Sequence, residues 1–127
     1  MTTALAPFTA QRTILLTTFR RDGTPVGTAV SIAVEGDHAY VRSYAQAGKA
    51  KRLRNNPDAE IAPSTVTGKP TGDAMPARLT LLDGAAAAHA ARLLTRKHPF
   101  LHGFLVPIAH RIKHYQTLHY ELRPRDR

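Results

Sequence analysis

The alternation of apolar and polar residues in the first third of the chain predicts three antiparallel strands. Residues 13–19 are rich in β-branched and apolar types, which is typical of a buried strand. Asp22 and Gly23 form a strong hairpin signal, and a returning strand is expected over 26–34. A second turn at 35–37 leads into a third strand over 38–44. The pattern therefore indicates a meander of three strands.

The predicted strand over 26–34 has two different faces. One carries the larger side chains, and the other carries only small ones, namely Gly27, Ala29, Ser31 and Ala33. Small residues let a neighbouring segment or a flat ligand approach the backbone closely. A tightly packed sheet would show the same pattern.

The rest of the chain adds three strands and two helical regions. We first expect a strand over 59–66, in which Pro63 marks an edge or a bulge, a Gly- and Pro-rich turn over 67–72, and a strand over 74–82. A helix over 83–97 follows, with Asp83 as its N-cap, and then a broken helical region over 100–113 and a last strand over 115–122. Six short, largely antiparallel strands favour a mainly β fold, a small barrel that the last strand closes, because closure removes exposed edges. Residues 1–127 are predicted to form one domain.

A short basic helix is predicted over 48–57, between the third and fourth strands. It carries Lys49, Lys51, Arg52 and Arg54, and Pro57 ends it. Cations are disfavoured at a helix N-terminus, where the unpaired N–H groups already carry partial positive charge. An anionic ligand would favour them there, and a solvated basic surface is the alternative.

Composition narrows the classes of partner. The net charge of +9 favours an anionic partner, but the cations are scattered, aromatic residues make up only 6%, and tryptophan is absent, which argues against nucleic acid. No segment resembles a signal peptide or a membrane span, so a cytoplasmic protein is expected. The absence of cysteine excludes disulfides, thiolate metal sites and cysteine nucleophiles.

Candidate catalytic and metal-binding patterns are weak. His98 and His102, and likewise His110 and His114, are four residues apart, but no further ligand lies near them in the sequence, so no metal site is predicted. No serine occupies a nucleophile elbow, and no glycine-rich dinucleotide or Walker loop is present. We assign no catalytic side chain, and an enzyme of this sequence would depend on a redox cofactor.

The order and spacing of several short motifs resemble those of the split β-barrel flavin and deazaflavin proteins. The motifs occupy 22–26, 35–37, 39–42, 48–57, 62–63 and 68–72, and the match extends from about Arg12 to Leu122. Among these proteins the chain is most similar to the pyridoxamine-phosphate-oxidase-class oxidoreductases that use the deazaflavin coenzyme F-420. Ala47 and Ser31 depart from the pattern, at positions where relatives often carry a basic residue and tryptophan.

The resemblance implies a homodimer with cofactor sites at the subunit interface and hydride transfer between F-420 and a small conjugated or carbonyl substrate. It implies that Lys49, Arg52 and Ser43 hold the phosphate and that Lys51 and Arg54 are solvated. The ring would lie near Val30, Pro63, Ser64, Pro70, Thr71 and Gly72, and Arg42 either polarises the ring or substrate or is an outward-facing cation. The alternatives are a flavin reductase or oxidase that binds flavin mononucleotide (FMN), and a non-enzymatic basic binding module.

Overall fold

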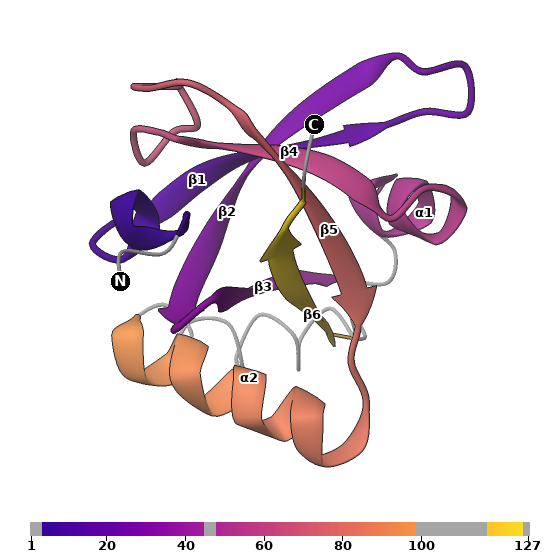
Figure 1. The fold of residues 1–127 in the computed structure, drawn as a ribbon. Helices are drawn as coiled ribbons and strands as arrows, with labels where there is room; N and C mark the ends of the chain where they lie inside the picture. Colours follow the sequence, from indigo (N-terminus) through magenta and orange to yellow (C-terminus); the bar gives the residue numbers. More distant parts are fainter. Residues whose placement is uncertain (1–3, 45–47, 99–116, 126–127) are drawn as a thin grey trace.

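Six antiparallel strands close into a barrel in the computed structural model, which describes residues 4–44, 48–98 and 117–125 (Figure 1). The strands are β1 (Thr13–Phe19), β2 (Pro25–Glu35), β3 (His38–Tyr44), β4 (Asp58–Pro63), β5 (Met75–Leu81) and β6 (Thr117–Pro124). The predicted mainly β fold and the initial meander are confirmed. The helical region expected over 100–113 lies outside the described residues, as do the first two residues of the predicted last strand.

The last strand closes the barrel, as the sequence predicts. In the order β1-β2-β3-β6-β5-β4, strand β6 lies between β3 and β5, and β1 pairs with β4. Val41 of β3 is opposite Tyr120 of β6, and Leu79 of β5 is opposite Leu122. Each of the six described strands therefore has two neighbours, although the pairing of β2 with β3 covers only Ile32–Glu35.

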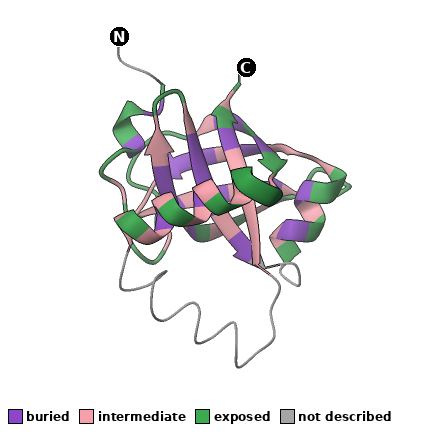
Figure 2. Cartoon of the chain, turned by 90° about the horizontal axis from the view of Figure 1, so that it is seen from below, coloured by how far each residue is buried: buried purple, intermediate pink, exposed green. Residues whose placement is uncertain are grey.

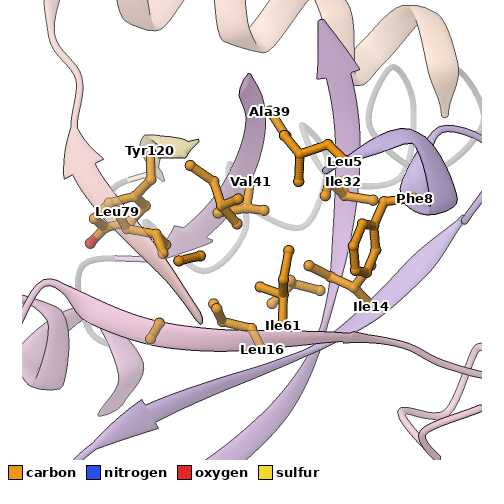
Figure 3. Close-up of a cluster of buried hydrophobic side chains, with 14 of the residues drawn as sticks. Leu5, Phe8, Ile14, Leu16, Ile32, Ala39, Val41, Ile61, Leu79 and Tyr120 are labelled. Atoms are coloured by element: carbon orange, nitrogen blue, oxygen red, sulfur yellow. The ribbon is translucent and has the colours of Figure 1, made fainter. Parts of the chain in front are cut away.

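Alternate residues of each strand fill the barrel interior. Ile14, Leu16, Ile32, Val41 and Ile61 are almost completely buried there (Figure 3). The larger face predicted for 26–34 points inward over its second half, where Val30 and Ile32 belong to this core and Val34 packs against it. Burial of these aliphatic side chains is the main term that favours folding.

Two short helices contribute to the same core. The 3₁₀ helix η1 (Ala6–Phe8) supplies Phe8, and α1 (Gly48–Asn55) supplies Leu53; Figure 1 shows these helices on opposite sides of the barrel. Helix α1 ends at Asn55, so Arg52 and Arg54 belong to its last turn, where the helix dipole favours cations. The expectation that all four cations occupy an unfavourable helix end is therefore wrong for these two residues.

Helix α2 (Gly84–Lys97) covers the outer face of β2, β3 and β6. Its buried residues Ala90 and Leu94 pack against Ala33 and Tyr40 and form a second, smaller core. Figure 2 shows the exposed side of this helix turned toward solvent. Asp83 occupies the predicted N-cap position, but its side chain makes no capping hydrogen bond.

Pro63 is the last residue of β4 and lies beyond the part of β4 that pairs with β5, which covers Asp58–Ile61. Its ladder partner is Ile14 of β1, so the predicted edge position holds locally, although β4 as a whole has two neighbours. The missing N–H of Pro63 falls where the ladder ends, and its carbonyl accepts a hydrogen bond from Thr71 N at 2.8 Å. Among the described helices none is long and apolar enough to span a membrane.

Candidate functional site

A tight hairpin turn places two arginines beside α1. Gly23 N donates to the carbonyl of Arg20 at 2.8 Å, and Arg20 N donates to the carbonyl of Thr24 at 2.9 Å. Gly23 has φ +89°, a conformation that glycine adopts without strain, and Asp22 Oδ1 accepts a hydrogen bond from Thr24 N. The backbone that carries Arg20 and Arg21 is thus fixed locally.

A groove of about 390 Å³ lies between this turn and α1. Among the described residues its lining contains four cationic side chains, one aromatic ring and no carboxylate. The lining residues are Phe19, Arg20, Arg21, Gly48, Lys51, Arg52 and Asn55. Guanidinium and ammonium groups brought together repel one another and attract anions. Of the four, Arg20 has an acidic neighbour, because hydrogen bonds from Thr24 and, to a smaller extent, the charge of Arg20 lower the pKa of Asp22. We call the lining residues the basic groove.

Arg52 is the best-positioned cation of the basic groove. Its Nε donates a hydrogen bond of 2.6 Å to the hydroxyl of Thr18, a fully buried residue of β1. A Cβ at Gly48 would lie only 2.8 Å from Arg52 Nη1, so glycine leaves the space that the guanidinium occupies. The hydrogen bond to Thr18 therefore orients Arg52, and Gly48 leaves room for that orientation.

The two lysines of α1 have different surroundings. Burial, and secondarily the charge of Arg52, lowers the pKa of Lys49, which is half-buried. Lys49 is not among the residues that line the basic groove, whereas Lys51 is exposed and lines it. Arg54 is exposed and does not line the groove. The predicted solvation of Lys51 and Arg54 agrees with their exposure, but Lys51 shares the groove with Arg52.

Ser43 and Arg42 lie on opposite faces of β3. Ser43 is buried, on the same inward-facing side as Val41, whereas Arg42 lies on the outer face, where its Nη2 donates to Thr117 Oγ1 at 3.4 Å. Arg42 is opposite His119 of β6, and the pKa of His119 is lowered, first by burial and then by the charge of Arg42. Arg42 is not part of the basic groove.

The residues predicted to hold the ring gather at the end of β4. Pro63, Ser64 and the exposed turn residues Pro70, Thr71 and Gly72 are close together. Ser64 forms a bridge with Pro70, its hydroxyl donates to the carbonyl of Thr13, and a Cβ at Gly72 would lie 2.8 Å from the Pro63 ring. Val30 is the exception, because its side chain is buried inside the barrel.

The predicted site residues thus form two groups at opposite ends of β1. Ile14 pairs with Pro63 at one end, and Thr18 binds Arg52 near the other. At a rise of about 3.3 Å per residue, these two points are roughly 13 Å apart along the strand. One protomer does not bring the two groups into a single pocket.

Arg20 and Arg21 are site residues that sequence reasoning missed. In the sequence they are two of many scattered cations, and only their position at the Asp22–Gly23 hairpin distinguishes them. Their proximity to α1 depends on contacts between α1 and β1, which the sequence pattern does not specify. The small face of β2 is partly explained by packing, because Ala29 contacts Gly68 and Ala33 contacts the α2 core.

Glu35, at the end of β2, binds two histidines and a tyrosine. His89 Nε2 lies 3.0 Å from each carboxylate oxygen, His38 Nε2 lies 3.2 Å from Oε1, and Tyr40 donates its hydroxyl to Oε1 at 3.1 Å. The hydrogen bond from His89 makes the largest contribution to lowering the pKa of Glu35. Burial and Glu35 raise the pKa of Tyr40 to about 12.

In the part of the chain that the structure describes, no group of three or more histidine or acidic side chains is arranged to hold a metal ion. His102, His110 and His114 lie outside the described residues.

Comparison with known proteins identifies the fold. No family model matches the chain, and no curated protein matches its sequence. Among solved structures it is similar to HutZ, the heme storage protein from Vibrio cholerae, with a TM-score of 0.71, 14% identity, and coverage of 93% of this chain and 84% of HutZ. It is also similar to a protein from Listeria innocua described provisionally as a pyridoxamine 5'-phosphate oxidase, with a TM-score of 0.66, 14% identity, and coverage of 96% and 90%.

A third similar structure is a Bacteroides thetaiotaomicron protein described provisionally as a 5-nitroimidazole antibiotic resistance protein. It has a TM-score of 0.68, 12% identity, and coverage of 94% of this chain and 76% of that chain. At such low identities the likeness establishes the fold, while function depends on the site. The chain therefore has the split β-barrel architecture that these proteins share.

Proposed function

We propose that the chain binds an anionic redox cofactor and acts as an oxidoreductase, with the deazaflavin coenzyme F-420 as the cofactor. The basic groove carries this proposal, because four cations and no carboxylate line it within residues 4–44, 48–98 and 117–125. The names of the similar structures support a cofactor-related role, since they refer to heme storage and to a pyridoxamine 5'-phosphate oxidase.

The residues of the groove would bind the acidic groups of the cofactor. Arg52, fixed by Thr18, would pair with a phosphate oxygen, and Arg20, Arg21 and Lys51 would neutralise the remaining charge. The half-buried Lys49 and the buried Ser43 would support the same end of the ligand. When bound, F-420 would supply the hydride for a small conjugated or carbonyl substrate, and we assign no side chain as acid or base.

F-420 fits the groove better than FMN because of its charge. The side chain of F-420 carries a phosphate diester and several carboxylates, whereas FMN carries one phosphate. Four lining cations exceed what a single phosphate needs, but they match an extended acidic side chain. FMN stays the alternative cofactor within the same fold.

A homodimer would explain why the predicted site residues form two groups. The basic groove and the 63–72 segment lie at opposite ends of β1 within one protomer. We propose that each cofactor site combines the groove of one protomer with the ring-binding segment of its partner. Pro63, Ser64, Pro70, Thr71 and Gly72 would then contact the ring through backbone and small side chains.

The test is a pair of titrations of purified protein with F-420 and with FMN, followed by absorbance and fluorescence. Arg52→Ala should weaken F-420 binding, and Lys49→Ala should weaken it too, because half-buried Lys49 lies close enough to Arg52 for the two charges to interact. Arg54→Ala, which removes an exposed cation of the same helix, should bind like wild type. Equal affinity of wild type and both site variants would contradict the assignment.

Further titrations of wild type with heme and with DNA or RNA separate the remaining alternatives. Tighter binding of FMN than of F-420 would identify a flavin protein, and the Soret absorbance of a stoichiometric heme complex would identify a heme protein. A DNA or RNA affinity that falls steeply with salt, without uptake of any cofactor, would indicate the basic binding module.

A further inference from the structure

A second cavity, remote from the basic groove, lies between η1, β2 and the C-terminal turn of α2. Its volume is about 230 Å³, and its lining combines apolar side chains with two cations: Thr9, Ala33, Val34, Leu93, Arg96 and Lys97. Along β2, Ala33 is eight residues from Pro25, which pairs with Phe19 of the groove. That separation corresponds to roughly 25 Å of extended strand, so the two sites do not overlap.

The ammonium group of Lys97 is buried at this cavity, and none of the described residues forms a hydrogen bond with it. Its Nζ is shielded from solvent and contacts no acceptor in the part of the chain that the structure describes. A buried ammonium normally has several hydrogen bonds or a counterion, because desolvation of an unpaired charge is costly. Burial accordingly lowers the pKa of Lys97. The position of Lys97 in the last turn of α2 favours a cation through the helix dipole, but the dipole does not supply a hydrogen bond.

No carboxylate on the elements that form the cavity is available to Lys97. Helices η1 and α2 contain no acidic residue, and the only one in β2 is Glu35. Glu35 is already bound to His38, His89 and Tyr40. An external anion would therefore not have to compete with a carboxylate of η1, α2 or β2 for the ammonium group of Lys97.

The surrounding charge is positive as well. His98 follows α2, and its Nε2–H donates to the carbonyl of Ile32 at 3.1 Å. The pKa of His98 is lowered, chiefly by burial and in addition by the charges of Lys97 and Arg12. Arg96 lines the cavity next to Lys97, so the last turn of α2 brings two cations to the cavity.

We propose that this cavity binds a compact organic carboxylate, with the carboxylate on Lys97 Nζ and Arg96 and the apolar body against Ala33, Val34 and Leu93. The apolar lining distinguishes this occupant from inorganic phosphate, which would leave the aliphatic side chains uncovered. A cavity of about 150 Å³ accommodates benzene, so 230 Å³ suits a ligand of roughly nine non-hydrogen atoms. Benzoate has this size and this combination of groups.

The experiment is an NMR titration of the ¹⁵N-labelled full-length chain with benzoate, with benzamide as the neutral ligand of matched shape. Benzoate should shift the amide signals of Thr9, Ala33, Val34 and Lys97, and benzamide should bind at least tenfold more weakly. The side-chain ¹³Cε signal of Lys97 should titrate at higher pH in the presence of saturating benzoate, because an anion favours the charged amine.

Lys97→Met keeps the length of the side chain and removes the charge, and it should weaken benzoate binding at least tenfold. Arg92→Met, at an exposed position of the same helix outside the cavity lining, should leave binding unchanged. Lys97→Met should fold, because it removes an unpaired buried charge, and its melting temperature verifies this. If Lys97→Met does not fold, the difference between the affinities of wild type for benzoate and for benzamide tests the proposal. Equal binding of the two ligands, unchanged affinity in Lys97→Met, or amide shifts confined to the basic groove would overturn the proposal.

Discussion

Arg52 of α1 and Thr18 of β1 are joined by a hydrogen bond of 2.6 Å from Nε to Oγ1, at the end of the barrel where the basic groove lies. Thr18 is completely buried, and its hydroxyl therefore has no access to solvent. The bond connects α1 to the barrel wall and leaves the terminal nitrogens of the guanidinium for a ligand. It links the stability of the fold to the geometry of the groove.

Thr18→Val should lower both stability and cofactor affinity. The substitution keeps the shape of the side chain but removes the acceptor for Arg52 Nε, which should cost about 1 kcal/mol of unfolding free energy. Urea denaturation measures this change, and an F-420 titration measures the second effect. Thr17→Val, at the neighbouring half-buried position, is the control. If Thr17→Val lost as much unfolding free energy and F-420 affinity as Thr18→Val, the hydrogen bond to Arg52 would not be the cause of the losses.

Gly48→Ala should preserve the fold and weaken anion binding. The new Cβ would lie 2.8 Å from Arg52 Nη1, so the guanidinium must move, while alanine favours the helix more than glycine does. We expect an affinity loss of roughly fivefold, equivalent to about 1 kcal/mol. In an Arg52→Ala background the same substitution should have no further effect on binding. An additional loss in the double variant would show that Gly48 acts independently of Arg52.

Gly68→Ala should destabilise the protein more than Gly36→Ala. Both glycines have positive φ, +94° at Gly68 and +65° at Gly36. Alanine is strained in this left-handed conformation, so each variant should lose about 1–2 kcal/mol of unfolding free energy. Only at Gly68 would the new Cβ also meet a neighbour, 3.1 Å from the Cβ of Ala29. The difference between the two melting temperatures measures this additional contact. Equal losses would show that the turn moves away from β2 without cost.

The link between Glu35 and His89 should make part of the stability depend on pH. The pKa of Glu35 is lowered from its ordinary value of 4.5, mainly by the hydrogen bond from His89. A carboxylate with a lowered folded-state pKa stabilises the fold above its unfolded pKa, and this contribution disappears as the pH falls through the folded value. Wild type should therefore be more stable than Glu35→Gln at pH 6.

This advantage should shrink as the pH falls below 4.5 and vanish at more acidic pH. Thermal unfolding of both proteins across that range measures it, with Asp73→Asn as a variant at an exposed carboxylate elsewhere. A difference between wild type and Glu35→Gln that stayed constant with pH would contradict the ionic contribution of Glu35.

The sequence predicts most of the fold because its signals are local. Apolar alternation locates the strands, Asp22–Gly23 locates the first hairpin, and Pro57 limits α1. The Lys–Arg run of α1 also indicates where an anion could bind. The features that the sequence misses depend on neighbours: barrel closure buries the side chain of Val30 in the core, away from the other residues predicted to hold the ring.

Only the tertiary structure decided which residues line the basic groove and which charged side chains are buried. Arg20 and Lys51 are 31 positions apart, and they meet because α1 packs against β1. Lys97 looks like an ordinary cation of a helix C-terminus, yet its ammonium group is buried beside an apolar cavity. The sequence by itself determined which segments form strands and helices, since periodicity and turn chemistry act over a few residues. The packing of distant segments decides which charges are brought together and which are desolvated. That packing is set by the closed barrel and by the helices that lie against it.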